Sequence, residues 1–86
     1  MIEGDQLPSS VDSLYETIAA ILAIPPESLS EESSPETVAS WDSVNHLNLV
    51  MALESEFGIR LSPEDALAMR SVRAARALLK KRGVPL

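Results

Sequence analysis

Hydrophobic residues recur at helical spacing in the first quarter of the chain. They follow the i, i+3, i+4, i+7 pattern of an amphipathic helix, and they comprise Val11, Leu14, Tyr15, Ile18, Ile21 and Leu22. A helix start is expected at Ser10 or Ser13, because Ser13 and Glu16 have the spacing of a capping box. The helix is expected to end before Pro25 and Pro26, since proline lacks the N–H that a helix interior requires.

A second apolar stripe begins after Asp42 and Ser43 and stops at Gly58, a residue type that is common just beyond the last helical turn. The stripe consists of Val44, Leu47, Val50, Met51 and Phe57, and Leu49 and Leu53 widen it. This spacing predicts a long helix whose stripe packs in the core or at its edge.

Two shorter helices are predicted near the C-terminus. Residues 62–65, Ser-Pro-Glu-Asp, form a strong helix start, because Ser caps, Pro suits the first helical position and acids suit the first turn. Few apolar residues follow, so this helix is short. Ser71 caps the last helix, which Gly83 and Pro85 close. Its buried face is expected to comprise Val72, Ala75, Leu78 and Leu79.

The connection between the first two helices is long and polar. Residues 27–40 carry five Ser and four Glu, with few apolar anchors. No segment alternates with a period of two, so no strand is expected. The pattern predicts an all-α fold, a four-helix bundle with a long loop between helices one and two and a short third helix. We expect residues 10–83 to form the domain, residues 1–9 to be a flexible lead-in and residues 84–86 to be a C-terminal tail.

Charge is divided unevenly along the 86 residues. Residues 1–43 hold nine acids and no base, whereas residues 44–86 hold four acids and seven bases, for a net charge of −6. The simplest interpretation is that the bases complement a helix C-terminus and the acids keep the domain soluble. The alternative is that the acidic half offers a surface to basic partners. The net charge argues against binding to nucleic acid.

Composition excludes several classes of function. The absence of Cys excludes disulfides, thiolate metal sites and a Cys nucleophile, and we expect no metal site. The longest apolar run, residues 18–24, is too short to span a membrane. The N-terminus lacks the features of a signal peptide, so we expect a cytoplasmic protein. No Ser/His/Asp set and no Gly-rich phosphate loop is present, so the chain is not expected to be an enzyme.

Ser43 stands where a long loop meets a helix. A Ser at this position is usually only a helix cap. Its hydroxyl also lies where backbone N–H groups and the helix dipole favour negative charge. Ser43 is therefore a chemically reasonable acceptor for a phosphate ester.

The segment around Ser43 resembles a known family. Residues 41–59, WDSVNHLNLVMALESEFGI, are similar to the second helix of acyl carrier proteins. In that family, Asp-Ser-Leu/Val is followed by an amphipathic helix that ends Leu-Glu-x-x-Phe-Gly/Asp-Ile/Val. The resemblance extends to the Pro-rich exit from the first helix (residues 21–29), the start of the third (residues 61–65) and the start of the fourth (residues 71–72).

The resemblance implies that Ser43 carries 4′-phosphopantetheine, whose terminal thiol holds an acyl or aminoacyl group as a thioester. It implies that Asp42 assists a phosphopantetheinyl transferase together with its magnesium-bound coenzyme A. The domain would be a monomeric carrier in biosynthesis, loaded by acyl or aminoacyl ligases or synthases, without membrane insertion. By analogy with the family, partner enzymes contact Val44, Leu47, Glu54, Glu56 and Ile59.

Two departures from the bacterial fatty-acid type indicate which kind of carrier to expect. Trp41 precedes Asp42, where that type has a Leu-Gly-x lead-in, and Asn45 and Asn48 stand where it usually has acids. Fewer acids weaken docking onto basic patches of fatty-acid enzymes. The Trp-Asp-Ser form resembles discrete carriers of specialised or secondary metabolism.

The residues beside the Asp-Ser pair carry structural and functional interpretations. Trp41 is expected to be a hydrophobic anchor for the loop, with contact to the pantetheine arm as the alternative. His46 is expected to be solvent-exposed, with an approach to the phosphate or to a partner as the alternative.

A different class of function stays open at this stage. The chain could be a small helical interaction or regulatory domain that is not pantetheinylated, with Ser43 as a mere cap or a phosphorylation site. A hydrolase that uses Ser43 lacks a positioned base.

Overall fold

The computed structural model describes residues 10–85, with side chains from residue 13 onward. Its elements are α1 (Ser10–Leu22), the 3₁₀ turn η2 (Pro26–Ser28), α2 (Ser43–Phe57), α3 (Pro63–Ala68) and α4 (Val72–Lys81). No strand occurs within this described range, so the predicted all-α class is confirmed, together with the short third helix and the long first loop. The predicted lead-in and the side chains of Ser10 and Val11 lie outside the described residues.

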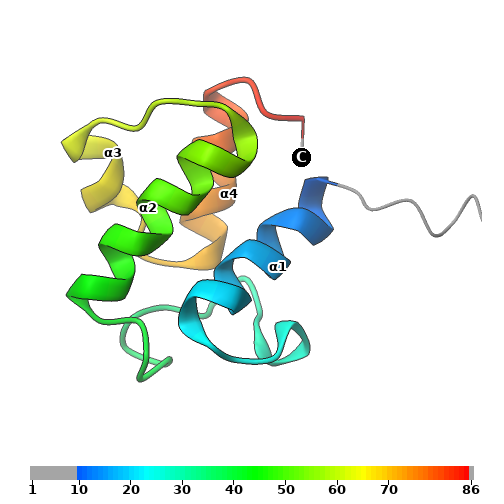
Figure 1. Cartoon of the computed structure of the whole chain (residues 1–86), viewed down its shortest axis with the longest axis vertical. Helices are drawn as coiled ribbons and strands as arrows, with labels where there is room; N and C mark the ends of the chain where they lie inside the picture. Colours follow the sequence, from blue (N-terminus) through cyan, green and yellow to red (C-terminus); the bar gives the residue numbers. More distant parts are fainter. Residues whose placement is uncertain (1–9, 86) are drawn as a thin grey trace, which may run out of the picture.

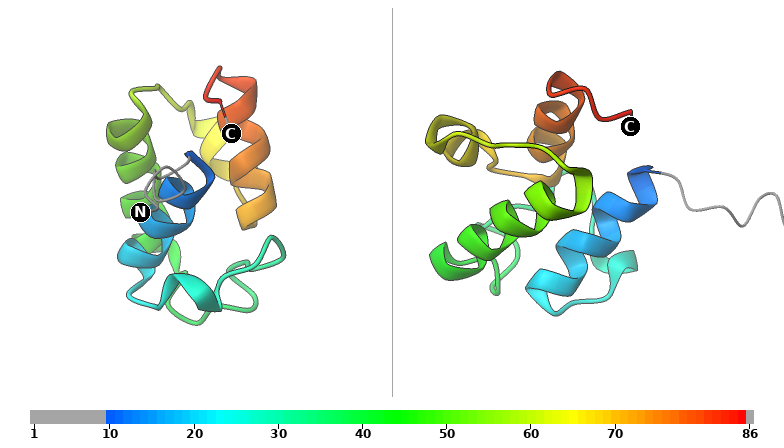
Figure 2. Two further views of the ribbon diagram at one scale, coloured as in Figure 1. Left: turned by 90° about the vertical axis from the view of Figure 1, so that its right-hand side faces the viewer. Right: turned by 45° about the horizontal axis from the view of Figure 1, so that its top comes forward.

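The helices enclose one core. α1 and α2 run antiparallel and pack together, while α3 lies beside α4 (Figure 1). The long loop between α1 and α2 closes one end of the bundle, next to the start of α4 (Figure 2). The helices α1, α2 and α4 and the link after α3 contribute fully buried side chains. The largest of these are Leu14, Ile18, Leu22, Leu49, Leu53, Met69, Leu79 and Val72.

The helix ends follow the local chemistry that the sequence predicts. α2 ends at Gly58, which takes the left-handed conformation with φ 65°, and α3 begins with a capping box between Ser62 and Asp65. Ala23, just after α1, adopts a positive φ of 59°, a left-handed conformation that is uncommon for residues other than glycine. At the other end of the chain Val84, the first residue of the predicted tail, is 8% exposed and packs in the core.

The long loop is held by backbone hydrogen bonds to the start of α4. The first N–H groups of a helix have no partner within it. Here those of Val72 and Arg73 donate to the carbonyls of Ser33 and Glu31, both at 3.0 Å. Ser71 caps the next one, that of Ala74, at 3.0 Å. The loop therefore acts as part of the cap of α4.

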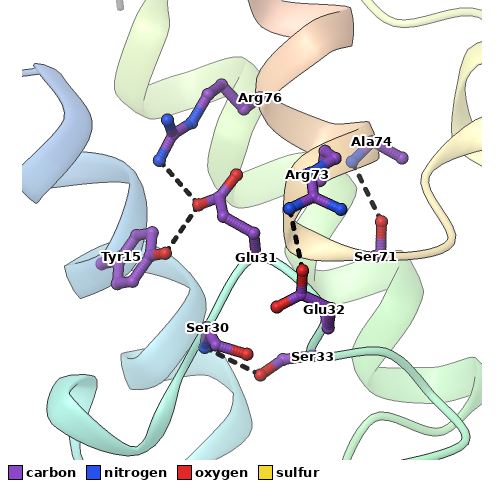
Figure 3. Close-up of polar contacts among 9 residues, drawn as sticks. All are labelled: Tyr15, Ser30, Glu31, Glu32, Ser33, Ser71, Arg73, Ala74 and Arg76. Carbon is purple, nitrogen blue, oxygen red and sulfur yellow. Dashed lines mark hydrogen bonds and ion pairs between the residues drawn. The ribbon is translucent and has the colours of Figure 1, made fainter.

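Two ion pairs and a tyrosine hydrogen bond reinforce this junction, and we call these three contacts the loop clamp (Figure 3). Glu31 accepts hydrogen bonds from the hydroxyl of Tyr15 at 2.6 Å and from Arg76 at 2.7 Å. Glu32 accepts one from Arg73 at 2.8 Å. The clamp joins α1, the loop and α4. Neither interpretation of the uneven charge anticipates it: loop acids pair with α4 bases inside one molecule.

Candidate functional site

The start of α2 places Ser43 beside its own cap. Asp42 is the N-cap residue, and its Oδ1 accepts a hydrogen bond from the backbone N–H of Asn45 at 2.8 Å. Ser43 is the first residue of the helix and is exposed. Within the described part of the chain no hydrogen bond involves its hydroxyl. The expectation that Ser43 itself caps the helix is therefore wrong, because Asp42 takes that role.

Trp41 anchors the end of the long loop. Its side chain is only 2% exposed and belongs to the core, so the predicted hydrophobic anchor is confirmed. Its indole N–H donates to Nδ1 of His46 at 3.0 Å, and the two rings are stacked with centroids 6.3 Å apart. The loop therefore reaches Ser43 from a fixed point one residue before the cap.

His46 differs from its prediction. It is half-buried rather than solvent-exposed, because Trp41 covers one side of the ring and Nε2 lies 2.7 Å from the carbonyl oxygen of Ala66 in α3. A lone His in an amphipathic pattern gives no hint of these partners, since Ala66 lies 20 residues away along the chain.

The two asparagines at the start of α2 have structural roles. Nδ2 of Asn45 donates to the carbonyl of Ser40 at 2.8 Å, which ties the helix to the preceding loop. Asn48 donates to Oδ1 of Asn45 at 3.3 Å. The amides therefore brace the loop that presents Ser43, a role that carboxylates could not fill as donors.

An open groove begins at Ser43 and runs between α2 and α3. Its volume is about 790 Å³. It is lined mainly by apolar side chains, with a few charged groups at its edge. The lining residues are Pro35, Glu36, Trp41, Asp42, Ser43, His46, Leu47, Val50, Leu61, Ser62, Pro63, Ala66, Leu67, Met69 and Arg70. The sequence pattern does not indicate the α3 wall, because only the chain reversal after Gly58 brings α3 opposite α2.

Part of the apolar stripe of α2 faces outward. The helix buries Leu49, Val50 and Leu53 against the core. Three members of the predicted stripe are exposed instead, and a fourth exposed apolar side chain lies on α3. Their exposed fractions are 68% for Val44, 63% for Leu47, 58% for Met51 and 74% for Leu67. The prediction that Val44 and Leu47 pack in the core or at its edge, and that Met51 packs in the core, is therefore wrong.

The three remaining predicted partner residues have different settings. Glu54 is half-buried, and its Oε2 accepts the backbone N–H of Leu61 at 2.8 Å, so it braces the link after α2 rather than standing free in solvent. Glu56 is exposed. Ile59 packs against the core from its edge.

Charged groups around α3 and the loop clamp have shifted proton affinities. Hydrogen bonding to the backbone of Ser62, followed by the Arg82 guanidinium, lowers the pKa of Asp65. The hydrogen bond from Arg73 lowers the pKa of Glu32, and the hydrogen bond to Glu31 raises that of Tyr15. These shifts belong to structural contacts, and no described carboxylate pair forms a catalytic set.

Neither a metal-binding cluster nor a membrane-spanning helix occurs among the described residues. No cluster of three or more His, Asp or Glu side chains in this part of the chain is arranged to hold a metal ion. No helix there is long and apolar enough to cross a membrane.

Comparisons with known proteins point to the same region. A family profile described as a phosphopantetheine attachment site matches residues 12–79. Acyl carrier protein 1, chloroplastic, from Casuarina glauca is 31% identical over 74 residues, which cover 86% of this chain and 54% of that protein. The chain thus spans about half the length of this curated relative.

The fold has a solved counterpart. The solution structure of a holo acyl carrier protein from Geobacter metallireducens matches with a TM-score of 0.75, over 88% of this chain and 86% of that one. The two sequences are 24% identical, so the match concerns the fold.

Proposed function

This chain belongs to the acyl carrier protein family, a family of carriers rather than catalysts that hold 4′-phosphopantetheine, and we propose that Ser43 is the attachment residue. The observation that carries the proposal is the free, exposed hydroxyl of Ser43 in the first turn of α2. A serine that capped the helix would have its oxygen engaged. Here Asp42 fills the cap, so the hydroxyl is available for modification.

The surroundings of Ser43 suit a phosphodiester. The N-terminus of a helix favours a negative charge through its free N–H groups and its dipole. α2 has no acid in its first turn after the cap, so no carboxylate within that turn opposes the charge. The brace formed by Asn45 and the anchor formed by Trp41 hold this turn in place before any group is attached.

Asp42 is proposed to serve both the fold and the transferase. It caps α2, yet its side chain is exposed beside Ser43, where a phosphopantetheinyl transferase with bound coenzyme A can reach it. The capping bond fixes the carboxylate next to the hydroxyl that is to be modified. We propose that this fixed geometry is what the transferase recognises.

The prosthetic group supplies the thiol on which an acyl or aminoacyl cargo is held as a thioester. The chain has no Cys and so has no thiol of its own, and its role is to hold the thiol of the prosthetic group in position. The apolar groove that starts at Ser43 gives the first part of the arm a surface to lie on. The carrier then raises the effective concentration of the cargo at each partner enzyme.

We propose that partners dock mainly on an apolar surface. The exposed side chains of Val44, Leu47, Met51 and Leu67 lie on α2 and α3 near the attachment site. We call these four residues the apolar docking surface. Glu56 adds a charge at the far end of α2, whereas Glu54 is occupied by the backbone of Leu61. Burial of apolar side chains, more than attraction between charges, would then stabilise the complexes.

The predominance of apolar over acidic side chains on the proposed docking surface supports a role in specialised metabolism. Partner enzymes that read acids along the start of α2 would find amides at Asn45 and Asn48. The amide of Asn45 is engaged in holding the loop, and that of Asn48 donates to Asn45. We therefore propose that the carrier serves enzymes with an apolar complement to its docking surface rather than enzymes with a basic patch.

Loading with coenzyme A tests the attachment site. The chain is incubated with coenzyme A, Mg²⁺ and a promiscuous phosphopantetheinyl transferase, and its intact mass is measured. We expect the wild type and Ser55→Ala, a matched change at an exposed serine later in α2, to gain one phosphopantetheine. Ser43→Ala should stay unmodified while keeping its helical circular dichroism. Loading of Ser43→Ala would refute the assignment.

A further inference from the structure

A chain of hydrogen bonds crosses the groove from the loop to α3. It runs from the indole N–H of Trp41 to Nδ1 of His46, over 3.0 Å, and from Nε2 of the same ring to the carbonyl of Ala66, over 2.7 Å. All three residues line the groove that begins at Ser43. Trp41 and His46 are the only tryptophan and the only histidine in the sequence.

The partners dictate the protonation state of the ring. Indole N–H is a donor only, so Nδ1 of His46 must accept and therefore carries no proton. The carbonyl of Ala66 is an acceptor only, so Nε2 must donate. The arrangement thus requires the neutral imidazole with its proton on Nε2.

This ring is the polar link between the two walls of the groove. Among the hydrogen bonds of residues 10–85, the one between His46 and Ala66 is the sole bond that joins a side chain or backbone group of α2 to one of α3. α3 is short and has no buried residue of its own. Its position relative to α2 therefore depends on this link together with the core contacts of Ala66 and of the adjoining Met69. Its capped connection to residue 62 and the ion pair between Asp65 and Arg82 hold its start and tie it to the end of α4.

We propose that Trp41, His46 and Ala66 form a latch that fixes the width of the groove beside Ser43 and is released when His46 takes up a proton. A second proton on the ring would sit on Nδ1, facing the indole N–H, and two donors cannot bond to each other. The ring must then turn away from Trp41, and the contact with Ala66 shifts with it. Protonation of the ring would in this way loosen α3 and widen the groove.

Other charged groups face the same space and have to be separated from the histidine. Glu36, Asp42 and Arg70 line the groove, and Glu36 and Arg70 lie 3.9 Å apart. On α3, Asp65 is held by Ser62 and Arg82, and Glu64 is exposed. A test therefore needs a variant that keeps all of these groups and removes only the titrating ring.

His46→Gln is that variant. The side-chain amide of glutamine offers an oxygen to accept from Trp41 and an N–H to donate to Ala66, but it does not titrate. His46→Phe serves as the opposite control, because it keeps a ring of similar size and removes both hydrogen bonds.

The experiment follows the unmodified full-length chain by nuclear magnetic resonance from about pH 7.5 to about pH 5.5, the range in which histidines ordinarily change charge. In the wild type, the indole N–H resonance of Trp41 should move together with the His46 ring signals. Hydrogen-exchange protection of the Ala66 and Met69 amides, corrected for intrinsic rates, should fall about fivefold or more. In His46→Gln both readings should stay nearly constant, and in His46→Phe protection should be low throughout.

The proposal is overturned if the indole resonance does not follow the titration of His46. It is also overturned if the α3 amides lose protection equally in His46→Gln, since carboxylates would then be responsible. Neither reading depends on Ser43 carrying a group, so failure of the latch and failure of the attachment site are distinguishable.

Discussion

Asp42 and Ser43 divide two tasks that sequence alone assigns to one residue. Both types of side chain are common helix caps, and a sequence pattern cannot tell which of two neighbours takes the position. In the structure Asp42 bonds the backbone N–H of Asn45, and the hydroxyl of Ser43 stays free. The distinction matters because it separates the residue that stabilises α2 from the residue that is proposed to be modified.

Substitutions at the two positions should therefore have different effects on folding. Asp42→Ala should lower the free energy of unfolding by about 1 kcal/mol, because it removes the cap. Ser43→Ala should change it by less than about 0.5 kcal/mol, as expected for an exposed side chain without a hydrogen bond. Urea denaturation of both variants gives the comparison. An equal or larger loss in Ser43→Ala would mean that its hydroxyl supports the helix after all.

Asp65 links stability to acid. Its pKa is lowered in the folded state, first by the backbone of Ser62 and then by Arg82, so the folded protein favours the charged form. The resulting stabilisation is present above the ordinary pKa of 3.8 and is lost as the pH falls through the lower, folded value.

Asp65→Asn should therefore flatten the acid side of the stability profile. Asparagine can still accept the hydrogen bond of the N-cap backbone, but it does not titrate. The thermal midpoint of the wild type should drop on acidification below about pH 4, and that of Asp65→Asn should drop less. Identical profiles in thermal melts from neutral to strongly acidic pH would exclude this contribution. Glu32, whose pKa is also lowered, accounts for part of the remaining slope.

At the scale of elements, the sequence predicts the positions of the helices more accurately than the faces that they turn toward the core. Caps, proline and glycine are local signals, so the bounds of α2, α3 and α4 agree with the pattern. α2, however, carries apolar residues on two faces, and periodicity cannot say which face meets the core. The choice is made by packing against α1, which buries Leu49 and Leu53 and leaves Leu47 and Met51 outside.

The loop clamp could not be predicted for a related reason. Glu31 and Arg76 are 45 residues apart, and nothing local in a polar loop marks one glutamate as the partner of a helix. The uneven charge along the chain is the only trace of the clamp in the sequence. Its meaning appears once the loop lies across the start of α4.

The two ion pairs of the clamp should contribute unequally. The side chains of Arg76 and Glu31 are only 29% and 24% exposed, and Glu31 also binds Tyr15, so Arg76→Ala should lower the free energy of unfolding by about 1–2 kcal/mol. Arg73→Ala is the matched control on the same helix. Its pair with Glu32 is 64% and 71% exposed, so solvent screens it and little change is expected. Chemical denaturation that ranks the two variants in the reverse order would contradict this account.

On the scale of the whole molecule, several acidic side chains are engaged in contacts within the fold and are not free to bind partners. Glu31 and Glu32 of the loop are paired with α4, and Glu54 and Asp65 brace turns of the backbone. The groove that begins at Ser43 is lined mainly by apolar side chains. Resemblance over residues 41–59 indicates the protein family and predicts Ser43 as the attachment residue. The groove and the exposed stripe depend on tertiary packing, which the pattern does not specify.

Partner enzymes should consequently respond to apolar substitutions more than to charge. Leu47→Ser combined with Met51→Ser should raise KM for loading by the transferase several-fold with little change in kcat, while the exposed positions leave stability nearly unchanged. Glu56→Gln is the charge control and should have a smaller effect. A dominant effect of Glu56→Gln, together with a steep salt dependence of KM, would instead indicate docking by acids.

The most direct test of the central claim is to locate the prosthetic group on the chain. Wild-type protein loaded from coenzyme A is fragmented in a mass spectrometer, and the fragments that carry the added phosphopantetheine are mapped. We predict that the group lies on Ser43 alone, at one copy per chain. A group on another serine, such as Ser40 or Ser55, or a well-folded chain that no phosphopantetheinyl transferase modifies, would contradict the account.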